Sequence, residues 1–244
     1  MQYIKKKILQ LINKKGYLVF QENLFKKRYQ LKSDFHPLEQ LFYQRLHSKF
    51  FFVQIGANDG ISFDPIYNLV TKEQVHGIAL EPVTSIYQKL KKNYANFPNV
   101  VLVNKDIHKT EKEMVLYRVN PENKQHPDWT IGTASFNKNH HELSNIPDAD
   151  IIEEKVECIS FDDLIAEYKM NHIDLLQIDT EGYDYEIIKM IDFDKIAPSI
   201  ISFEHGFTAG IMNREKLFDL QELLFRYKYN IVMLENDCIA YKEI

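Results

Sequence analysis

The chain has 244 residues, of which 45% are hydrophobic and 27% charged, and its formal net charge is −5. This balance is typical of a globular protein of one domain with additions, and the eight glycines exclude collagen-like and elastomeric classes. Two cysteines, Cys158 and Cys238, exclude a disulfide framework and a four-thiolate zinc site. No apolar run is long enough for a transmembrane helix and no signal-peptide pattern is present, so we expect a cytoplasmic protein.

The first part of the chain is basic and predicts helices. Residues 1–32 hold nine Lys and Arg against a single acidic residue, Glu22, and apolar residues recur there at helical spacing. This segment is interpreted as a solvated helix on the body of the domain; weak docking to a membrane surface or partner is the alternative. A second helix is expected from Pro37. Together these predict an N-terminal helical extension over residues 1–48, followed by a domain over 49–244.

From Phe50 onward, short apolar runs alternate with amphipathic segments. The expected strands are Phe51–Ile55, Val75–Leu80, Val100–Val103, Ile173–Ile178 and Ser199–Phe203. The expected helices between them are Asp64–Glu73, Pro82–Tyr94, Phe161–Tyr168 and Tyr183–Ile191. Tyr229–Leu234 and Cys238–Tyr241 predict a terminal antiparallel hairpin. This order indicates an α/β fold with a mostly parallel sheet and helices on both faces.

A long polar stretch interrupts this alternation. Met114–Val119 predicts an additional strand, and residues 120–150 then lack a helical period over most of their length. Loops this long inside a domain are usually functional lids or disordered. The only tryptophan, Trp129, lies in this stretch and is expected to anchor it by burial, with stacking on a substrate as the alternative. His140 and His141 lack metal-ligand spacing with a third residue.

Chemically useful side chains follow the expected strands, where open α/β sheets bind ligands. Gly56-Ala57-Asn58-Asp59-Gly60 after the first strand allows a tight turn and close approach to a ligand, although it is neither a dinucleotide nor a P-loop motif. Glu81 lies at the position where an acid binds ribose hydroxyls. Asp106, followed by Ile107, can accept a hydrogen bond from an adenine amino group.

The ends of the fourth and fifth strands are acidic. Asp179 and Glu181 are two residues apart and are expected to point the same way. Two carboxylates at one mouth are costly unless they bind a cation, hold donors or share a proton. Glu204-His205 follows the fifth strand, and a histidine beside a glutamate at this edge is a candidate general base.

These motifs, in this order, resemble the FkbM-type S-adenosylmethionine-dependent methyltransferases. The matching segments are Val53–Gly60, Glu81-Pro82 and Ile178–Tyr183, and the resemblance covers roughly Phe50 to His205. It implies a seven-stranded Rossmann-like sheet and S-adenosylmethionine as cofactor. The implied cofactor-binding residues are Gln54, Gly56, Ala57, Asn58, Gly60, Glu81, Pro82, Asp106, Ile107 and Asp179. Gln54 stands where such families often have an Asp, so a neutral hydrogen bond replaces an acidic contact.

The resemblance implies O-methylation of a hydroxyl on a sugar, glycan or related small molecule. A hydroxyl is a poor nucleophile and benefits from a base or a metal. The candidates for that role are His205, Glu204, Glu181 and Asp179. A divalent ion at Asp179 and Glu181 is a less favoured alternative, and no dedicated metal site is predicted. The 120–150 stretch would cover or select the acceptor.

Two other functions compete with methyl transfer. A nicotinamide-dependent oxidoreductase would use Glu81 equally well, but it expects a third glycine, and Asp59 would repel a pyrophosphate. A catalytically silent module docking through residues 1–32 is the other alternative. A nucleic-acid substrate is not expected, because basic charge is confined to one end and no base-flipping motif is present.

Overall fold

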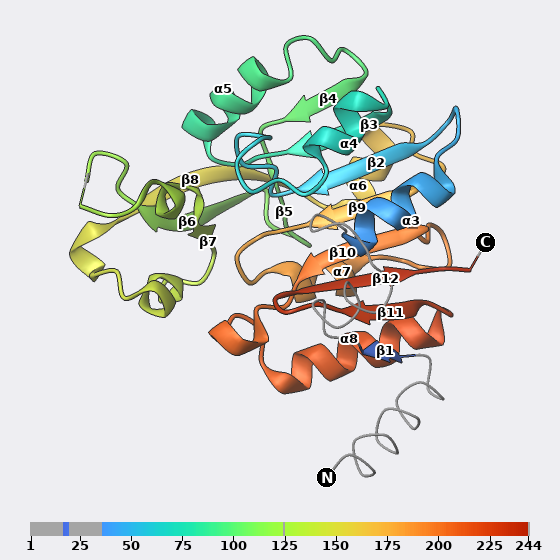
Figure 1. Ribbon diagram of the computed structural model, residues 1–244. Helices are drawn as coiled ribbons and strands as arrows, with labels where there is room; N and C mark the ends of the chain where they lie inside the picture. Colours follow the sequence, from blue (N-terminus) through green and yellow to red (C-terminus); the bar gives the residue numbers. More distant parts are fainter. Residues whose placement is uncertain (1–16, 20–35, 124, 244) are drawn as a thin grey trace.

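The computed structural model describes residues 17–19, 36–123 and 125–243, and a single large sheet runs through it (Figure 1). Five strands are parallel, in the order β10 (Ile200–Glu204), β9 (Leu175–Ile178), β2 (Phe51–Ile55), β3 (His76–Leu80) and β4 (Val100–Val103). The hairpin of β11 (Asn230–Met233) and β12 (Asp237–Tyr241) completes the sheet, with β12 antiparallel to β10. The expected Rossmann-like sheet of seven strands with a terminal antiparallel hairpin is therefore confirmed.

An eighth strand extends this sheet beyond the hairpin. Residues Tyr17–Val19 form β1, which pairs in parallel with β11. The segment before residue 48 is thus not helical throughout, because three of its residues form a strand that pairs with β11. The expected basic helix otherwise lies outside the described residues.

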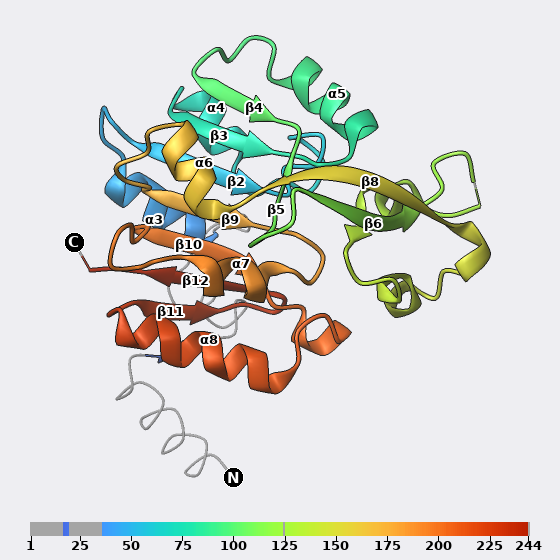
Figure 2. The ribbon, with the colours of Figure 1, turned by 180° about the vertical axis from the view of Figure 1, so that it is seen from behind.

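Helices cover both faces of the sheet, as expected (Figures 1 and 2). One face carries α3 (Pro37–Arg45), α4 (Tyr67–Lys72) and α5 (Thr84–Asn93); the other carries α6 (Phe161–Glu167), α7 (Asp184–Met190) and α8 (Arg214–Arg226). Alternate strand residues serve the two cores: Val53 and Ile55 pack towards α6 and α7, and Phe52 packs towards α3. No helix in the described ranges has the length and apolar character that a membrane span requires.

Helix α3 packs as part of this body. His36 caps its first turn by accepting a hydrogen bond from the Leu38 backbone at 3.3 Å, and Pro37 occupies a position where no N–H is needed. Leu38 and Phe42 are fully buried against Phe50 and Phe52. The boundary between an extension and a domain at residues 48 and 49 stays a prediction.

A second, smaller sheet projects from the body as an arm (Figures 1 and 2). It contains β5 (Asp106–Ile107), β8 (Ile151–Ile159), β6 (Glu113–Val119) and β7 (Ala134–Ser135), in that order. We call residues 120–150 the insert. It is ordered by short 3-10 turns at Asp128–Gly132, His140–Ser144 and Asp148–Asp150. Neither β8 nor α8 was expected from the sequence.

Candidate functional site

Close approach of two strand-end loops builds the base of the site. Gly56 and Ala57 both donate backbone hydrogen bonds to Leu80 O, at 3.1 and 2.8 Å. Gly56 has φ +79°, and a Cβ there would lie 1.7 Å from Asp179 O. Only glycine permits this approach, so the Gly56–Asn58 turn and the Asp179 loop are held against each other. Gly60 has a different role, because a Cβ there would collide with Leu90 and Tyr94 of the α5 region.

The side chain of Glu81 is held by two backbone N–H groups, one from the glycine turn after β2 and one from the start of the helix after Glu81. Asn58 N donates to Glu81 Oε2 at 2.9 Å, and Val83 N donates to Glu81 Oε1 at 2.8 Å. Burial, opposed by the Val83 N–H and assisted by the charge of Asp106, raises the pKa of Glu81 to about 8. Each oxygen keeps a second lone pair, so the carboxyl group is oriented and can still accept ligand hydroxyls.

Asp106 is the first residue of β5, the strand of the arm that follows β4. It is buried, and its Oδ1 accepts a hydrogen bond from Ile107 N at 2.7 Å. Burial raises the pKa of Asp106 to about 7. Asn104 donates to the carbonyl oxygens of Glu81 and Pro82, at 2.8 and 2.9 Å, which fixes the loop between the two acids.

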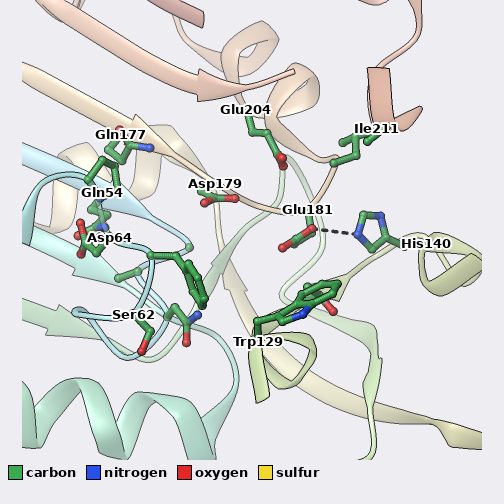
Figure 3. Close-up of a pocket in the computed structure, with 18 of the residues that line it drawn as sticks. Gln54, Ser62, Asp64, Trp129, His140, Gln177, Asp179, Glu181, Glu204 and Ile211 are labelled. Carbon is green, nitrogen blue, oxygen red and sulfur yellow. Dashed lines mark hydrogen bonds and ion pairs between the residues drawn. The ribbon is translucent and has the colours of Figure 1, made fainter. Parts of the chain in front are cut away.

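Two adjoining cavities open at this edge of the sheet. The smaller, of about 60 Å³, contains Glu81, Pro82, Asp106, Ala134 and Thr180. The larger, of about 320 Å³, is formed by the strand ends, the turn before α4 and the insert (Figure 3). The residues that line both are Gly56, Asn58, Gly132, Asp179 and Glu181. We call the smaller one the cofactor cavity and the larger one the acceptor cavity, after the roles that we propose for them below.

The expected cofactor residues divide between these cavities. Gly56, Asn58, Glu81, Pro82, Asp106 and Asp179 line the smaller one. Gln54 and Ala57 line only the larger one. Gly60 and Ile107 line neither: Gly60 serves the packing of α5, and Ile107 is buried in the main core. The structure thus brings most of the predicted residues together at one edge.

Asp179 and Glu181 both lie where the two cavities join. The backbone at Glu181 is left-handed and not extended as expected. Glu181 has φ +52°, a conformation that costs energy in a residue with a Cβ. Burial, and next the charge of Glu181, raises the pKa of Asp179 well above its usual value. Asp184 supports the loop: its Oδ2 accepts from Thr180 Oγ1 at 2.7 Å and its Oδ1 from Glu204 N at 3.0 Å.

The insert holds Glu181 in place at two points. Ser135 Oγ donates to the Glu181 carbonyl oxygen at 2.8 Å, and His140 Nε2 lies 2.9 Å from Glu181 Oε2 (Figure 3). Both the main chain and the side chain of Glu181 therefore depend on residues of the insert. His140 lines the acceptor cavity and was not expected to take part, because its partner is far away in the sequence.

Glu204 also faces the acceptor cavity. Burial, and next the charges of Asp179 and Glu181, raises the pKa of Glu204 to about 9. Its Oε2 is buried and has no hydrogen-bond partner among the described residues. This carboxyl group is therefore largely protonated near neutral pH, and it can offer or accept a hydrogen bond within the cavity.

His205 does not lie where the sequence led us to expect it. It is buried, it lines neither cavity, and its Nδ1 accepts a hydrogen bond from Phe207 N at 3.1 Å. Its backbone N–H donates to Asn236 O of the terminal hairpin at 2.8 Å. Burial lowers the pKa of His205. These contacts tie the end of β10 to the hairpin and place the imidazole away from the acceptor cavity.

A row of polar residues crosses the sheet beneath the acceptor cavity. Gln54 of β2 is in register with Gln177 of β9, which is in register with Ser202 of β10. Gln54 Nε2 donates to Asp64 Oδ2 at 3.0 Å, so this amide is held within the protein, and its expected contact with the cofactor stays a prediction. Gln54 Oε1 and Gln177 Oε1 are buried without hydrogen-bond partners in the described part of the chain.

In the described ranges, no group of three or more His, Cys, Asp or Glu is arranged to hold a metal ion. The arrangement does fit S-adenosylmethionine: an oriented acid for ribose hydroxyls at Glu81, a glycine turn that lets a ligand approach the backbone at Gly56, and a buried acid at Asp106.

Solved methyltransferases resemble this structure at low sequence identity. The chain matches the METTL16 MTase domain with 13% identity and a TM-score of 0.45, over 84% of this chain and 64% of that one, so it spans less than two thirds of the METTL16 chain. A TehB-like SAM-dependent methyltransferase from Corynebacterium glutamicum matches with 10% identity and a TM-score of 0.42, over 91% and 97% of the two chains. A precorrin-6y C5,15-methyltransferase from Geobacter metallireducens matches with 15% identity and a TM-score of 0.40, over 83% and 84%.

The sequence comparisons are more specific. A search of curated proteins finds no significant match. The family model described as "Methyltransferase FkbM domain" matches residues 54–231, which is more than half of the chain and includes every strand-end motif described above. The chain therefore belongs to the FkbM family of S-adenosylmethionine-dependent methyltransferases.

Proposed function

We propose that this methyltransferase methylates a hydroxyl group of a sugar, glycan or related small molecule. The observation that carries the proposal is the shared lining of the two cavities. Asp179 and Glu181 are the two acidic side chains among the residues that line both. A group that passes from one cavity to the other passes these carboxyl groups, and a hydroxyl must lose its proton there.

The cofactor cavity, of about 60 Å³, is assigned to the adenosine end of S-adenosylmethionine, whose methionine end would extend past Gly56 and Asn58 into the larger cavity. Glu81 would accept hydrogen bonds from ribose hydroxyls, Asp106 would face the adenine, and Gly56 and Asn58 would lie along the methionine portion. When bound, the cofactor supplies a methyl carbon on a sulfonium, and the sulfur leaves as a neutral thioether when that carbon bonds to the acceptor oxygen. Asp179, which lines both cavities, would hold the positively charged end of the cofactor.

We assign Glu181 as the proton acceptor. Its Oε2 is engaged by His140, which leaves Oε1 to take the hydroxyl proton as the new carbon–oxygen bond forms. The strained backbone at Glu181 and the hydrogen bond from Ser135 fix this geometry before the acceptor binds. His140 is a positioning residue, and the protonated Glu204 can donate a hydrogen bond to the acceptor.

Calorimetry followed by turnover tests this assignment. The protein should bind S-adenosylmethionine and S-adenosylhomocysteine but not NAD, and labelled cofactor should transfer its methyl group to a hydroxylated acceptor. Glu181→Gln should lower turnover about 100-fold or more and leave S-adenosylhomocysteine affinity nearly unchanged. Glu186→Gln is the matched control, because Glu186 lies on α7 and pairs with Lys216 at 2.7 Å.

Two results would contradict the proposal. No binding of either sulfur ligand would remove the cofactor assignment. Full turnover in Glu181→Gln would remove Glu181 as the proton acceptor, and an exclusive transfer to nitrogen or sulfur acceptors would remove the hydroxyl specificity.

A further inference from the structure

Two exposed aromatic rings stand at the acceptor cavity. Phe63, in the turn before α4, is 81% exposed, and Trp129, in the first 3-10 turn of the insert, is 47% exposed. Both line the acceptor cavity. Large exposed apolar side chains at a cavity mark a binding site more often than they serve stability, because exposure contributes no burial energy.

Phe63 is exposed but not loosely held. Before it, Asp59 accepts hydrogen bonds from Ile61 N and Ser62 N at 2.9 and 2.7 Å. After it, Asp64 accepts hydrogen bonds from Ile66 N and Tyr67 N at 2.7 and 3.0 Å. Two short acid-anchored turns therefore fix the backbone on either side of Phe63.

The backbone at Phe63 is also strained. Its φ is +59°, a left-handed conformation that is unfavourable for a bulky residue. Such strain persists only when its surroundings impose it, and it is concentrated at ligand sites. Because the ring is exposed, packing does not repay this cost. The strain aims the ring at the cavity before any ligand arrives, which reduces the entropy lost on binding.

The backbone around Trp129 is also fixed by contacts within the protein, while its ring is exposed. Thr130 is buried and anchors the turn, with its backbone N–H and its Oγ1 donating to Pro127 O at 3.0 and 2.8 Å. Gly132 packs so closely on Asn58 that a Cβ would lie 2.6 Å from the Asn58 amide nitrogen. The insert is thereby seated on the glycine turn with the indole left exposed at the cavity.

Unpaired polar atoms lie at the other side of this cavity. Figure 3 shows Gln54, Asp64 and Gln177 together on the side opposite Trp129 and His140. The Oε1 atoms of Gln54 and Gln177 are buried without partners among the described residues, and Asp64 fixes the amide orientation of Gln54 by accepting from its Nε2. A buried acceptor without a donor costs free energy, so this arrangement favours a ligand that brings donors.

The charge of the cavity restricts the ligand further. Asp64, Asp179, Glu181 and Glu204 line the acceptor cavity, whereas no Lys or Arg of the described ranges does. A phosphate or carboxylate placed among these groups would lose its hydration without a compensating cation. A hydroxylated ring has donors at its edge and apolar C–H groups on its faces, and this is the complement of amide oxygens beside aromatic rings.

We propose that Phe63 and Trp129 are the aromatic walls, and Gln54 and Gln177 the hydrogen-bonding floor, of an acceptor subsite for a sugar ring that carries no negative charge. This inference rests on the proposed function for the identity of the reaction, and it adds the residues that select the acceptor and the charge that they reject.

The single tryptophan of the chain reports binding at this subsite directly. Trp129 fluorescence is titrated with methyl α-glucoside, methyl α-galactoside and methyl α-mannoside, and with glucuronate and glucose 6-phosphate as anionic probes. The series is run on the full chain with and without S-adenosylhomocysteine, whose own binding is measured by calorimetry. We expect a saturable change with at least one neutral glycoside and none with the anionic sugars at equal concentration.

Two variants locate the response. Phe63→Ala should weaken the neutral glycoside about tenfold, because one stacking surface is lost, and should leave S-adenosylhomocysteine affinity unchanged. Phe218→Ala is the matched control: Phe218 is also an exposed aromatic ring, but it lies on α8 and lines neither cavity. It should bind the glycoside as the wild type does.

The outcomes separate the two proposals. No fluorescence change with any neutral glycoside in either series, or equal responses to neutral and anionic sugars, would overturn the subsite while S-adenosylhomocysteine binding leaves the cofactor assignment standing. Failure of S-adenosylhomocysteine to bind would overturn the proposed function, and the series without it would still decide the subsite. Equal glycoside affinity in Phe63→Ala and wild type would remove Phe63 from the walls.

Discussion

The two cavities share one edge of the sheet but are built on different principles. In the cofactor cavity the carboxyl groups are already hydrogen-bonded by the backbone: Glu81 accepts from Asn58 and Val83, and Asp106 accepts from Ile107. In the acceptor cavity, Gln54, Gln177 and Glu204 each keep a buried oxygen without a partner in the described chain. The polar groups of the first cavity have their hydrogen-bond partners within the fold, whereas those of the second would find them in a ligand. Changes to the first should therefore weaken both stability and binding, whereas changes to the second should weaken binding without a loss of stability.

The largest effect is expected from Gly56→Ala. The new Cβ would lie 1.7 Å from Asp179 O, so the two strand-end loops must separate. We expect no measurable S-adenosylhomocysteine binding by calorimetry, and a loss of about 3–5 kcal/mol in the free energy of unfolding from denaturant titration.

Gly210→Ala is the matched control for that change. Gly210 has a similar φ of +84°, but a Cβ there meets nothing closer than Leu143 Cδ2 at 3.5 Å. It should cost only the backbone strain, about 1–2 kcal/mol. Equal losses in the two variants would mean that strain, and not the close approach of the loops, makes Gly56 necessary.

The hydrogen-bonded acids should also make the ligand-free protein less stable as the pH rises. Burial raises the pKa of Glu81 to about 8 and of Asp106 to about 7, above the values near 4 of the unfolded chain. Between about pH 5 and 7 the folded state retains protons that the unfolded state has lost, so each of the two acids lowers stability by about 1.4 kcal/mol per pH unit.

Thermal unfolding of the ligand-free protein from pH 5 to 8 measures this slope together with the contribution of Glu204, whose pKa is raised to about 9. Surface acids cannot imitate it, because Lys112 lowers the pKa of Asp163 and Lys195 lowers that of Asp192, so both titrate below the window. A melting temperature that rises over this range would contradict the burial of the two acids in the folded state.

Glu81→Ala tests whether Glu81 contributes to cofactor binding. Loss of its two acceptor oxygens should weaken S-adenosylhomocysteine about 10- to 100-fold by calorimetry. Glu157→Ala, on an exposed position of β8, is the control and should bind as the wild type does. A Glu81→Ala affinity within about twofold of wild type would show that this acid is structural, because one lost charge-assisted hydrogen bond exceeds that difference.

The same contrast explains what the sequence could predict. Gly56, Glu81 and Asp179 were found because they follow apolar strands whose pattern is local and whose ends must meet at one edge of a parallel sheet. Strand β8 was missed because Ile151–Ile159 is rich in charge, and it becomes a strand by pairing with β6, which lies across the whole insert in the sequence.

The acceptor side depends on contacts that have no local signal. His140 acquires its role from Glu181, 41 residues away, and Trp129, expected to be buried, is exposed because Thr130 anchors the turn instead. His205 has the sequence position of a base, but its backbone donates to Asn236 O of the β11–β12 hairpin and its imidazole accepts from Phe207 N, away from the cavity. Such placements depend on tertiary pairing, which the pattern of one strand cannot contain.

The smallest expected effect tests the strain at Phe63. Phe63→Gly relieves a left-handed conformation costing about 1–2 kcal/mol and loses about 0.5–1 kcal/mol to the greater freedom of glycine in the unfolded chain. Because the ring is exposed, no burial energy is lost, and the free energy of unfolding should rise by up to about 1.5 kcal/mol. Lys169→Gly is the matched control, since Lys169 is exposed, has φ +51° and lies after α6, away from both cavities. Denaturant titration should show a similar gain in both variants, and only Phe63→Gly should lose the neutral glycoside. If Phe63→Gly stabilises the protein and abolishes glycoside binding, the aromatic ring is retained for binding at the expense of stability. Destabilisation by Phe63→Gly would instead show that Phe63 contributes to packing.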